Sequence, residues 1–145
     1  MIDNQDINVM ASRLRAHPVA RGIGDSQTLD IAAALEQLRA EQHSSVHGHR
    51  QVTLFHRPPL TLVLFAFDAG GLLPDHVAQR MVSIQVIDGS LTVQAAGVDH
   101  VLEAQQILLL NPAVAHSVRA GMPSAMLLTV YQAAAEGRDS DGRSD

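Results

Sequence analysis

The stretch GGLLPDHVAQRMVSIQVIDGSLTV, residues 70–93, contains the strongest structural pattern in the chain. Its second half has two apolar runs, MVSIQVI and SLTV, on either side of Asp88-Gly89, a dipeptide that favours a two-residue turn. Apolar and polar residues alternate in both runs, as in strands with one buried face. The stretch therefore predicts a β-hairpin. Its first half places one histidine, His76, after two glycines and a proline.

The same alternation continues on both sides of this stretch. Between about residue 50 and residue 132 the chain reads as many short strands separated by turn residues, with no helix-length apolar pattern between them. This arrangement predicts a mainly β, antiparallel sandwich or small barrel and excludes a parallel sheet with crossover helices. In LTLVLFAF, residues 60–67, we expect one alternating set to face the interior and the other the second sheet or solvent.

The regions that flank the strands have a different texture. Residues 1–45 read as a helical extension, in which Ile31, Leu35 and Leu38 form one apolar stripe. We expect a helix over about residues 28–42, capped by Ser26 or Thr28. Residues 46–133 form the β-domain, and the polar, Gly/Ser/Asp-rich residues 134–145 are expected to be disordered.

Composition excludes several classes of protein. The chain has 145 residues, which favours one folded domain, and a net charge of -5, which argues against nucleic-acid binding. It has no apolar run of about 18 residues, so we expect no membrane span, and no apolar signal core near the N-terminus, so we expect a cytoplasmic protein. The absence of cysteine excludes disulfides and thiolate ligands.

Residues 50–132 resemble the small, single-domain bacterial cupins of the RmlC-like type. The first cupin motif spaces a glycine, two histidines, a glutamate and a closing glycine along the chain. Laid on this sequence, Gly70, His76 and Gly89 match the motif, whereas Ala78 replaces the second histidine and Val82 the glutamate. The second motif centres on one histidine after a proline-containing turn. His116 matches that position, with Pro112 displaced by one residue and with Ala113 and Ala120 in place of a glycine and an asparagine.

The resemblance implies an antiparallel double-stranded β-helix, or jelly-roll barrel, with a pocket at one mouth, and it implies a homodimer. Cupins that bind metals generally use three histidines and one glutamate, of which His76 and His116 remain here. These two could hold a divalent ion such as Zn, Ni, Fe or Mn only weakly, because catalytic sites normally have at least three protein ligands. The alternative is a vestigial motif with no metal.

Two further residues are candidates for the pocket. Gln85 lies three residues beyond the glutamate position, so a regular strand turns it to the other face and a β-bulge would be needed to bring it in. Tyr131 lies on a strand that could line the barrel. His47 and His49 form a separate pair, which we interpret as a polar connection because no acidic residue is interleaved.

Three functional hypotheses remain open at this point. The first is a cupin that binds or senses a small molecule, with a largely apolar pocket suited to a small apolar or aromatic ligand. The second is a metal-dependent enzyme, a dioxygenase or an isomerase, that uses His76 and His116. The third is a structural or interaction subunit. The alternative to the first hypothesis is a barrel whose core is filled by side chains and has no usable cavity for a ligand.

Overall fold

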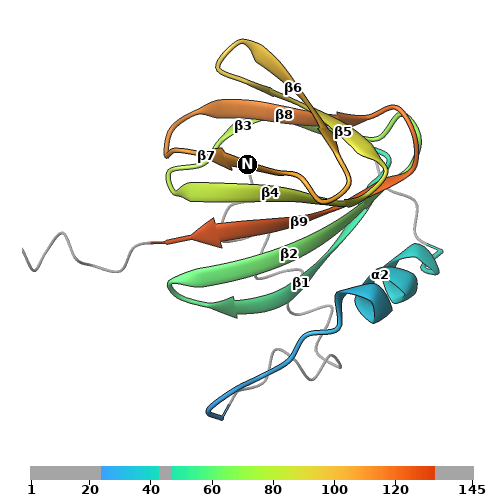
Figure 1. The fold of residues 1–145 in the computed structure, drawn as a ribbon, viewed down its shortest axis with the longest axis vertical. Helices are drawn as coiled ribbons and strands as arrows, with labels where there is room; N and C mark the ends of the chain where they lie inside the picture. The colour runs from blue at the N-terminus through green and yellow to red at the C-terminus, as the bar shows by residue number, and fades with distance from the viewer. Residues whose placement is uncertain (1–23, 43–46, 133–145) are drawn as a thin grey trace, which may run out of the picture.

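The computed structural model describes residues 24–42 and 47–132. Within these residues, nine strands follow one helix and form two sheets that face each other (Figure 1). The elements are α2 (Ile31–Arg39), β1 (His49–Arg57), β2 (Leu60–Phe67), β3 (Leu72–Val77), β4 (Met81–Asp88), β5 (Ser90–Ala95), β6 (Val98–Glu103), β7 (Ile107–Leu110), β8 (Ala115–Ala120) and β9 (Ser124–Tyr131).

All strand pairs are antiparallel, as the alternation predicted. The larger sheet has the order β1-β2-β9-β4-β7, and the smaller sheet has the order β3-β8-β5-β6. Consecutive strands often lie in different sheets, which is the crossing pattern of a jelly roll. The predicted fold class, a mainly β antiparallel jelly roll, is confirmed. Of the predicted N-terminal helices, one lies within the described residues.

The hairpin predicted at Asp88-Gly89 is wrong, although both of its strands exist. β4 belongs to the larger sheet and β5 to the smaller one, so the turn carries the chain from one sheet to the other. Asp88-Gly89 favours a sharp turn, and a sharp turn is needed both in a hairpin and where the chain passes from one sheet to the other. A true hairpin follows directly, because β5 pairs with β6 through Ala96 and Gly97, both with positive φ.

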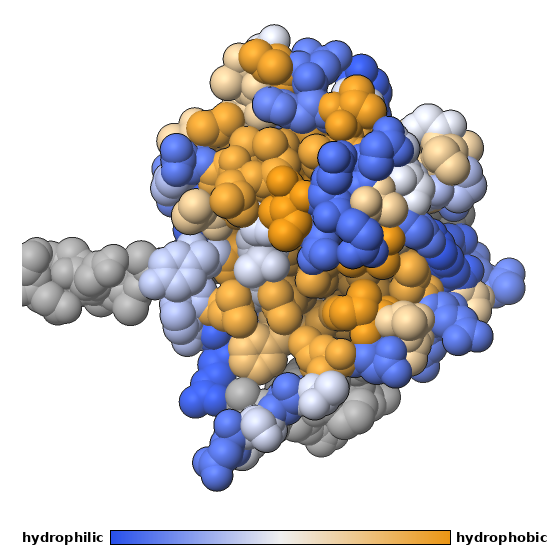
Figure 2. All heavy atoms as spheres, viewed as in Figure 1, coloured by the Kyte–Doolittle hydropathy of each residue, from blue (hydrophilic) through white to orange (hydrophobic). Residues whose placement is uncertain are grey.

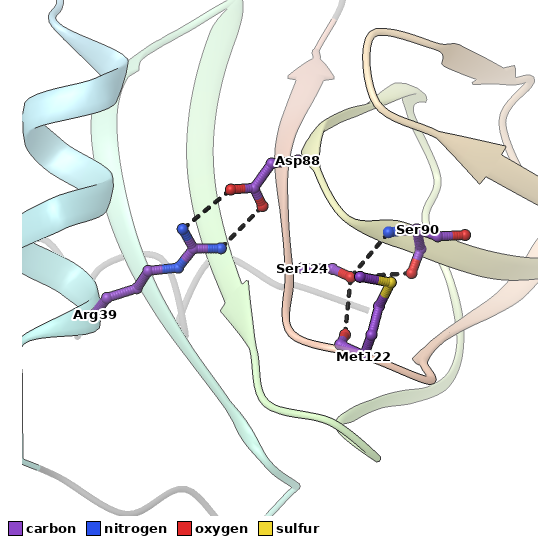
Figure 3. Close-up of polar contacts among 5 residues, drawn as sticks. All are labelled: Arg39, Asp88, Ser90, Met122 and Ser124. Carbon is purple, nitrogen blue, oxygen red and sulfur yellow. Dashed lines mark hydrogen bonds and ion pairs between the residues drawn. The ribbon is translucent and has the colours of Figure 1, made fainter.

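Gly89 and Ser124 fix this corner, and Figure 3 shows the contacts of Ser124. Gly89 has a φ of 83°, and a Cβ there would run into the Ser124 hydroxyl and lie 2.6 Å from the Pro123 carbonyl oxygen. The Ser124 hydroxyl, which is fully buried, accepts a hydrogen bond from the Ser90 N–H at 3.0 Å. It can donate to the carbonyl of Ser90 at 3.0 Å or of Met122 at 2.9 Å. The turn into β5 is thus joined to the turn into β9.

Two apolar cores follow from the alternation in the strands. Val63, Phe65 and Phe67 of β2 face the interior between the sheets, together with the inner residues of the other sheet. The opposite set, Leu64 and Ala66, packs against α2, which covers β1 and β2 from outside. The second face of β2 is therefore covered by the helix and not, as expected, by a sheet or solvent.

The helix is shorter than predicted and begins later. Its N-cap is Asp30, whose carboxylate accepts a hydrogen bond from the Ala33 N–H at 3.0 Å, in place of Ser26 or Thr28. At its other end, the guanidinium of Arg39 donates to both carboxylate oxygens of Asp88, at 2.9 and 3.1 Å (Figure 3). The remainder of the predicted N-terminal extension before residue 24, the boundary at 45/46 and the tail 134–145 lie outside the described residues.

The helix leaves part of the larger sheet uncovered by the described residues. Apolar side chains gather over β4 and β7 on the face shown in Figure 2. The large exposed ones on β4, β7 and β9 are Met81, Ile107, Leu109 and Tyr131. None of the helices in the described part of the chain is long and apolar enough to cross a membrane.

Candidate functional site

His76 and His116 lie opposite each other on neighbouring strands. They are direct cross-strand partners in the pairing of β3 with β8, and their ring centroids are 4.2 Å apart in an edge-to-face arrangement. His116 is only 2 % exposed, whereas His76 is half-buried. The two motif histidines, forty residues apart in the sequence, thus form one pair at the end of the smaller sheet.

Both imidazoles are held by the same local contact. The Nδ1 of His76 lies 2.7 Å from the carbonyl oxygen of Pro74, and the Nδ1 of His116 lies 3.0 Å from that of Val114. Because a carbonyl can only accept, each Nδ1 carries the proton and donates it. In its neutral form, each ring therefore has an unshared electron pair on Nε2, which can accept a hydrogen bond or bind a cation.

Burial keeps His76 neutral. Desolvation lowers the pKa of His76 to about 4, and the neighbouring His116 acts in the same direction. The Pro74 carbonyl and the Asp75 carboxylate oppose this shift but do not overcome it. At neutral pH, His76 is thus an acceptor at Nε2 and not a cation.

The two histidines open into a small pocket at this end of the barrel. The space that a water-sized molecule can occupy there is about 20 Å³, enough for about one water. The other lining residues are Ala78, Gln79, Arg80, Val82, Leu128 and Val130. The apolar core fills the barrel interior behind the pocket.

Ala78 and Val82 lie in the wall of the same pocket. These are the positions where the cupin motif places its second histidine and its glutamate. Two of the four positions that the motif assigns to ligands are therefore apolar in this pocket wall. Arg80 lines the same pocket as the two histidines.

The other two candidate pocket residues lie elsewhere. On β4, Val82, Ile84 and Val86 face the core between the sheets, so Gln85 faces the outer side of the larger sheet. The register shift of β4 comes only after Val86 and does not turn Gln85 inward. Tyr131 is 50 % exposed, one residue beyond the pocket-lining Val130, and so faces away as well. Neither residue lines this pocket.

The donor set of the pocket does not fit a metal. Within residues 24–42 and 47–132, histidine, aspartate and glutamate side chains form no group of three or more that could hold an ion. His76 and His116 contribute two nitrogens, whereas Ala78 and Val82 contribute none. The positive charge of Arg80 on the same wall opposes a divalent cation further.

The second histidine pair belongs to the opposite end of β3. The rings of His47 and His49 are stacked with their centroids 6.5 Å apart, and His49 also packs on Phe65 and Phe67. Burial lowers the pKa of His49, whose Nδ1 contacts the Leu72 carbonyl and whose Nε2 contacts Gln51. These contacts agree with the interpretation of the pair as a polar connection.

The chain is similar to known proteins in its three-dimensional structure. No family model and no curated protein matches the sequence. Among solved structures, an RmlC-like cupin from Shewanella frigidimarina superposes with a TM-score of 0.58 at 21 % identity, covering 68 % of this chain and 90 % of that one. A cupin superfamily protein from Desulfitobacterium hafniense superposes with a TM-score of 0.62 at 12 % identity, covering 79 % and 98 %. The chain has the cupin fold.

One of the similar solved structures is of a protein whose function is unknown. A conserved protein of unknown function from Streptococcus pyogenes superposes with a TM-score of 0.62 at 17 % identity, covering 80 % of this chain and 96 % of that one. At these identities the likeness establishes the fold alone. The chemistry must therefore be argued from the pocket itself.

Sequence reasoning missed Arg80 as a residue that lines this pocket. Arg80 lies between β3 and β4, and no motif position points to it. The available signal was its place between Ala78 and Val82, the two substituted ligand positions. The backbone carbonyls that hold the two imidazoles were also missed. Every residue has a backbone carbonyl, and the sequence does not show which of them lies next to a histidine ring.

Proposed function

We propose that this cupin binds a small polar molecule between β3 and β8 without the help of a metal. The observation that carries this proposal is the pair of imidazoles with Nδ1 fixed by backbone carbonyls. Such fixing restricts the orientation of both rings, and the two histidines line one water-sized space. A site that keeps two ordered polar groups next to apolar walls is typical of small-molecule recognition.

The metal-dependent enzyme is the weaker alternative. It needs a third ligand, and the pocket wall offers Ala78, Val82 and a guanidinium instead. A dioxygenase or isomerase that relies on a Lewis acid would therefore lack its ion. The cytoplasmic location and the homodimer remain predictions from the sequence.

Metal content and histidine spectroscopy test the proposal together. Elemental analysis of protein purified without a histidine tag, after soaking in Zn²⁺ or Ni²⁺, should find less than about a tenth of an equivalent of either metal. Nitrogen-15 spectra at neutral pH should show both rings as Nδ1–H tautomers, and small polar probes should shift the Nε2 resonances. Retention of one equivalent of metal, lost in His76→Ala but kept in the control His100→Gln on β6, would overturn the proposal.

A role as an interaction subunit is favoured by one separate observation. Met81, Ile107, Leu109 and Tyr131 expose large apolar surfaces on the outer side of the larger sheet, with Leu109 62 % exposed. We propose that a second copy of the chain covers this face, in line with the predicted homodimer. Analytical ultracentrifugation should then find a dimer that Leu109→Glu dissociates. A wild-type monomer would count against this role.

A further inference from the structure

Arg80 makes the pocket attractive to an anionic group. It is half-buried in the pocket wall, and no aspartate or glutamate in the described part of the chain pairs with it. By contrast, Arg39, Arg50 and Arg119 each lie within 4 Å of an aspartate. A guanidinium is charged at every physiological pH, and its planar fork matches a carboxylate. A carboxylate on a ligand would therefore form an ion pair with the Arg80 guanidinium.

The two histidines, by contrast, need a hydrogen-bond donor on the ligand. Each Nε2 presents an electron pair, because the proton of each ring is committed to a backbone carbonyl through Nδ1. A bare carboxylate oxygen would face these electron pairs without a proton between them. An ammonium group would satisfy them, but the charge of Arg80 on the same wall repels it. A neutral hydroxyl donates to Nε2 and carries no charge.

The size of the pocket limits what enters. The space beside His76 and His116 holds about one water, which is also the size of a hydroxyl group. Val82, Leu128 and Val130 border this space with apolar surface, suited to the carbon that bears the hydroxyl. Larger parts of a ligand must extend toward the mouth.

We infer that the ligand is a small hydroxy carboxylate, whose hydroxyl donates to one Nε2 of the histidine pair and whose carboxylate pairs with Arg80. This inference rests on the proposed function, since it names the chemistry of the same pocket. It differs from that function in requiring both groups on one molecule. It also assigns Arg80 as the residue that selects for the charge.

Three probes of similar size separate the two requirements. Lactate has both groups, propionate lacks the hydroxyl, and propane-1,2-diol lacks the carboxylate. Titrations at neutral pH, followed by the ring resonances of His76 and His116, yield a dissociation constant for each probe. We expect lactate to bind at least about tenfold more tightly than either of the others, because each missing group removes one hydrogen bond, charge-assisted in the case of the carboxylate.

A pair of arginine variants assigns the carboxylate. Arg80→Gln should lower the affinity for lactate to that for the diol and leave the diol unchanged. The matched control is Arg57→Gln, at the exposed end of β1 and outside the pocket, which should leave all three constants unchanged. Since Arg80 lies in a connection between strands, the variant should keep the amide spectrum of the folded protein.

The outcomes distinguish the inference from the proposed function. Equal affinities for lactate and propionate, or unchanged lactate binding in Arg80→Gln, would overturn the hydroxy carboxylate. If the diol alone shifted both rings, the pocket would still bind small polar molecules, and only the inference would be lost. If no probe shifted either ring, both the inference and the proposed function would be wrong.

Discussion

Replacement of Ser124 by alanine isolates the contact that joins the two turns at the corner of the barrel. The hydroxyl is fully buried, accepts from the Ser90 N–H at 3.0 Å and donates to one of two carbonyls. Alanine keeps the Cβ, so no cavity larger than one oxygen is created. What is lost is the acceptor of the Ser90 N–H, in a contact that is partly buried.

The magnitude follows from this loss of partners. A buried donor left without an acceptor costs roughly 1–3 kcal/mol, and the removed hydroxyl no longer has to be desolvated. We therefore expect Ser124→Ala to lower the free energy of unfolding by about 2 kcal/mol. For a domain of this size, that loss corresponds to a fall in Tm of roughly 5–10 °C.

Urea denaturation monitored by circular dichroism measures this loss directly. Ser90→Ala is the matched control, because the Ser90 hydroxyl is half-exposed and only reaches Glu103 at 3.4 Å, while its N–H remains. We expect the control to change the free energy of unfolding by less than about 0.5 kcal/mol. If both variants were equally stable, the Ser124 bonds would not hold the corner, and the reasoning would be refuted.

Three other changes probe the corner and the pocket. Gly89→Ala should lower the free energy of unfolding, measured by denaturant titration, by at least about 3 kcal/mol, because the added Cβ meets Ser124 and Pro123. In the control Gly97→Ala the added Cβ meets nothing within 4 Å, so the free energy of unfolding should fall by only about 1 kcal/mol. Equal losses in the two variants would contradict the predicted clash at Gly89. The pKa of His76 falls from its ordinary value of 6.5 to about 4 in the fold, so the unfolded chain binds more protons between these two pH values. The free energy of unfolding should therefore drop as pH falls from about 6.5 toward 4, by about 1–2 kcal/mol once solvent screening of the partly exposed ring is allowed for, and a His76→Gln variant that kept the full drop would contradict this. Ala78→His combined with Val82→Glu should bind about one equivalent of Zn²⁺ by calorimetry while the wild type binds none, and a failure to bind would show that the four side chains do not converge.

The fold was predictable because strands carry local signals. Alternation in MVSIQVI and LTLVLFAF marked the buried faces correctly, and those faces build the two cores. Sheet membership was not predictable in the same way. Asp88-Gly89 has the sequence of a hairpin turn, but pairing depends on partners far along the chain, such as β9 for β4.

The site was predictable only where a motif marked it. The resemblance to cupins pointed to His76 and His116, which the structure brings together. Gln85 and Tyr131 were chosen for chemistry on strands whose facing was unknown, and both face outward. Arg80 was missed because its importance depends on what surrounds it, namely two imidazoles and no carboxylate partner in the described residues.

The position of β9 has a consequence for how the chain assembles during synthesis. β9 is the last described strand in sequence, yet it lies in the middle of the larger sheet, between β2 and β4. Until Ser124–Tyr131 leaves the ribosome, β1 with β2 and β4 with β7 can exist only as separate pieces with open edges. The two pieces join when β9 enters between them, so this barrel closes after translation of the strand region and not progressively from its N-terminal side.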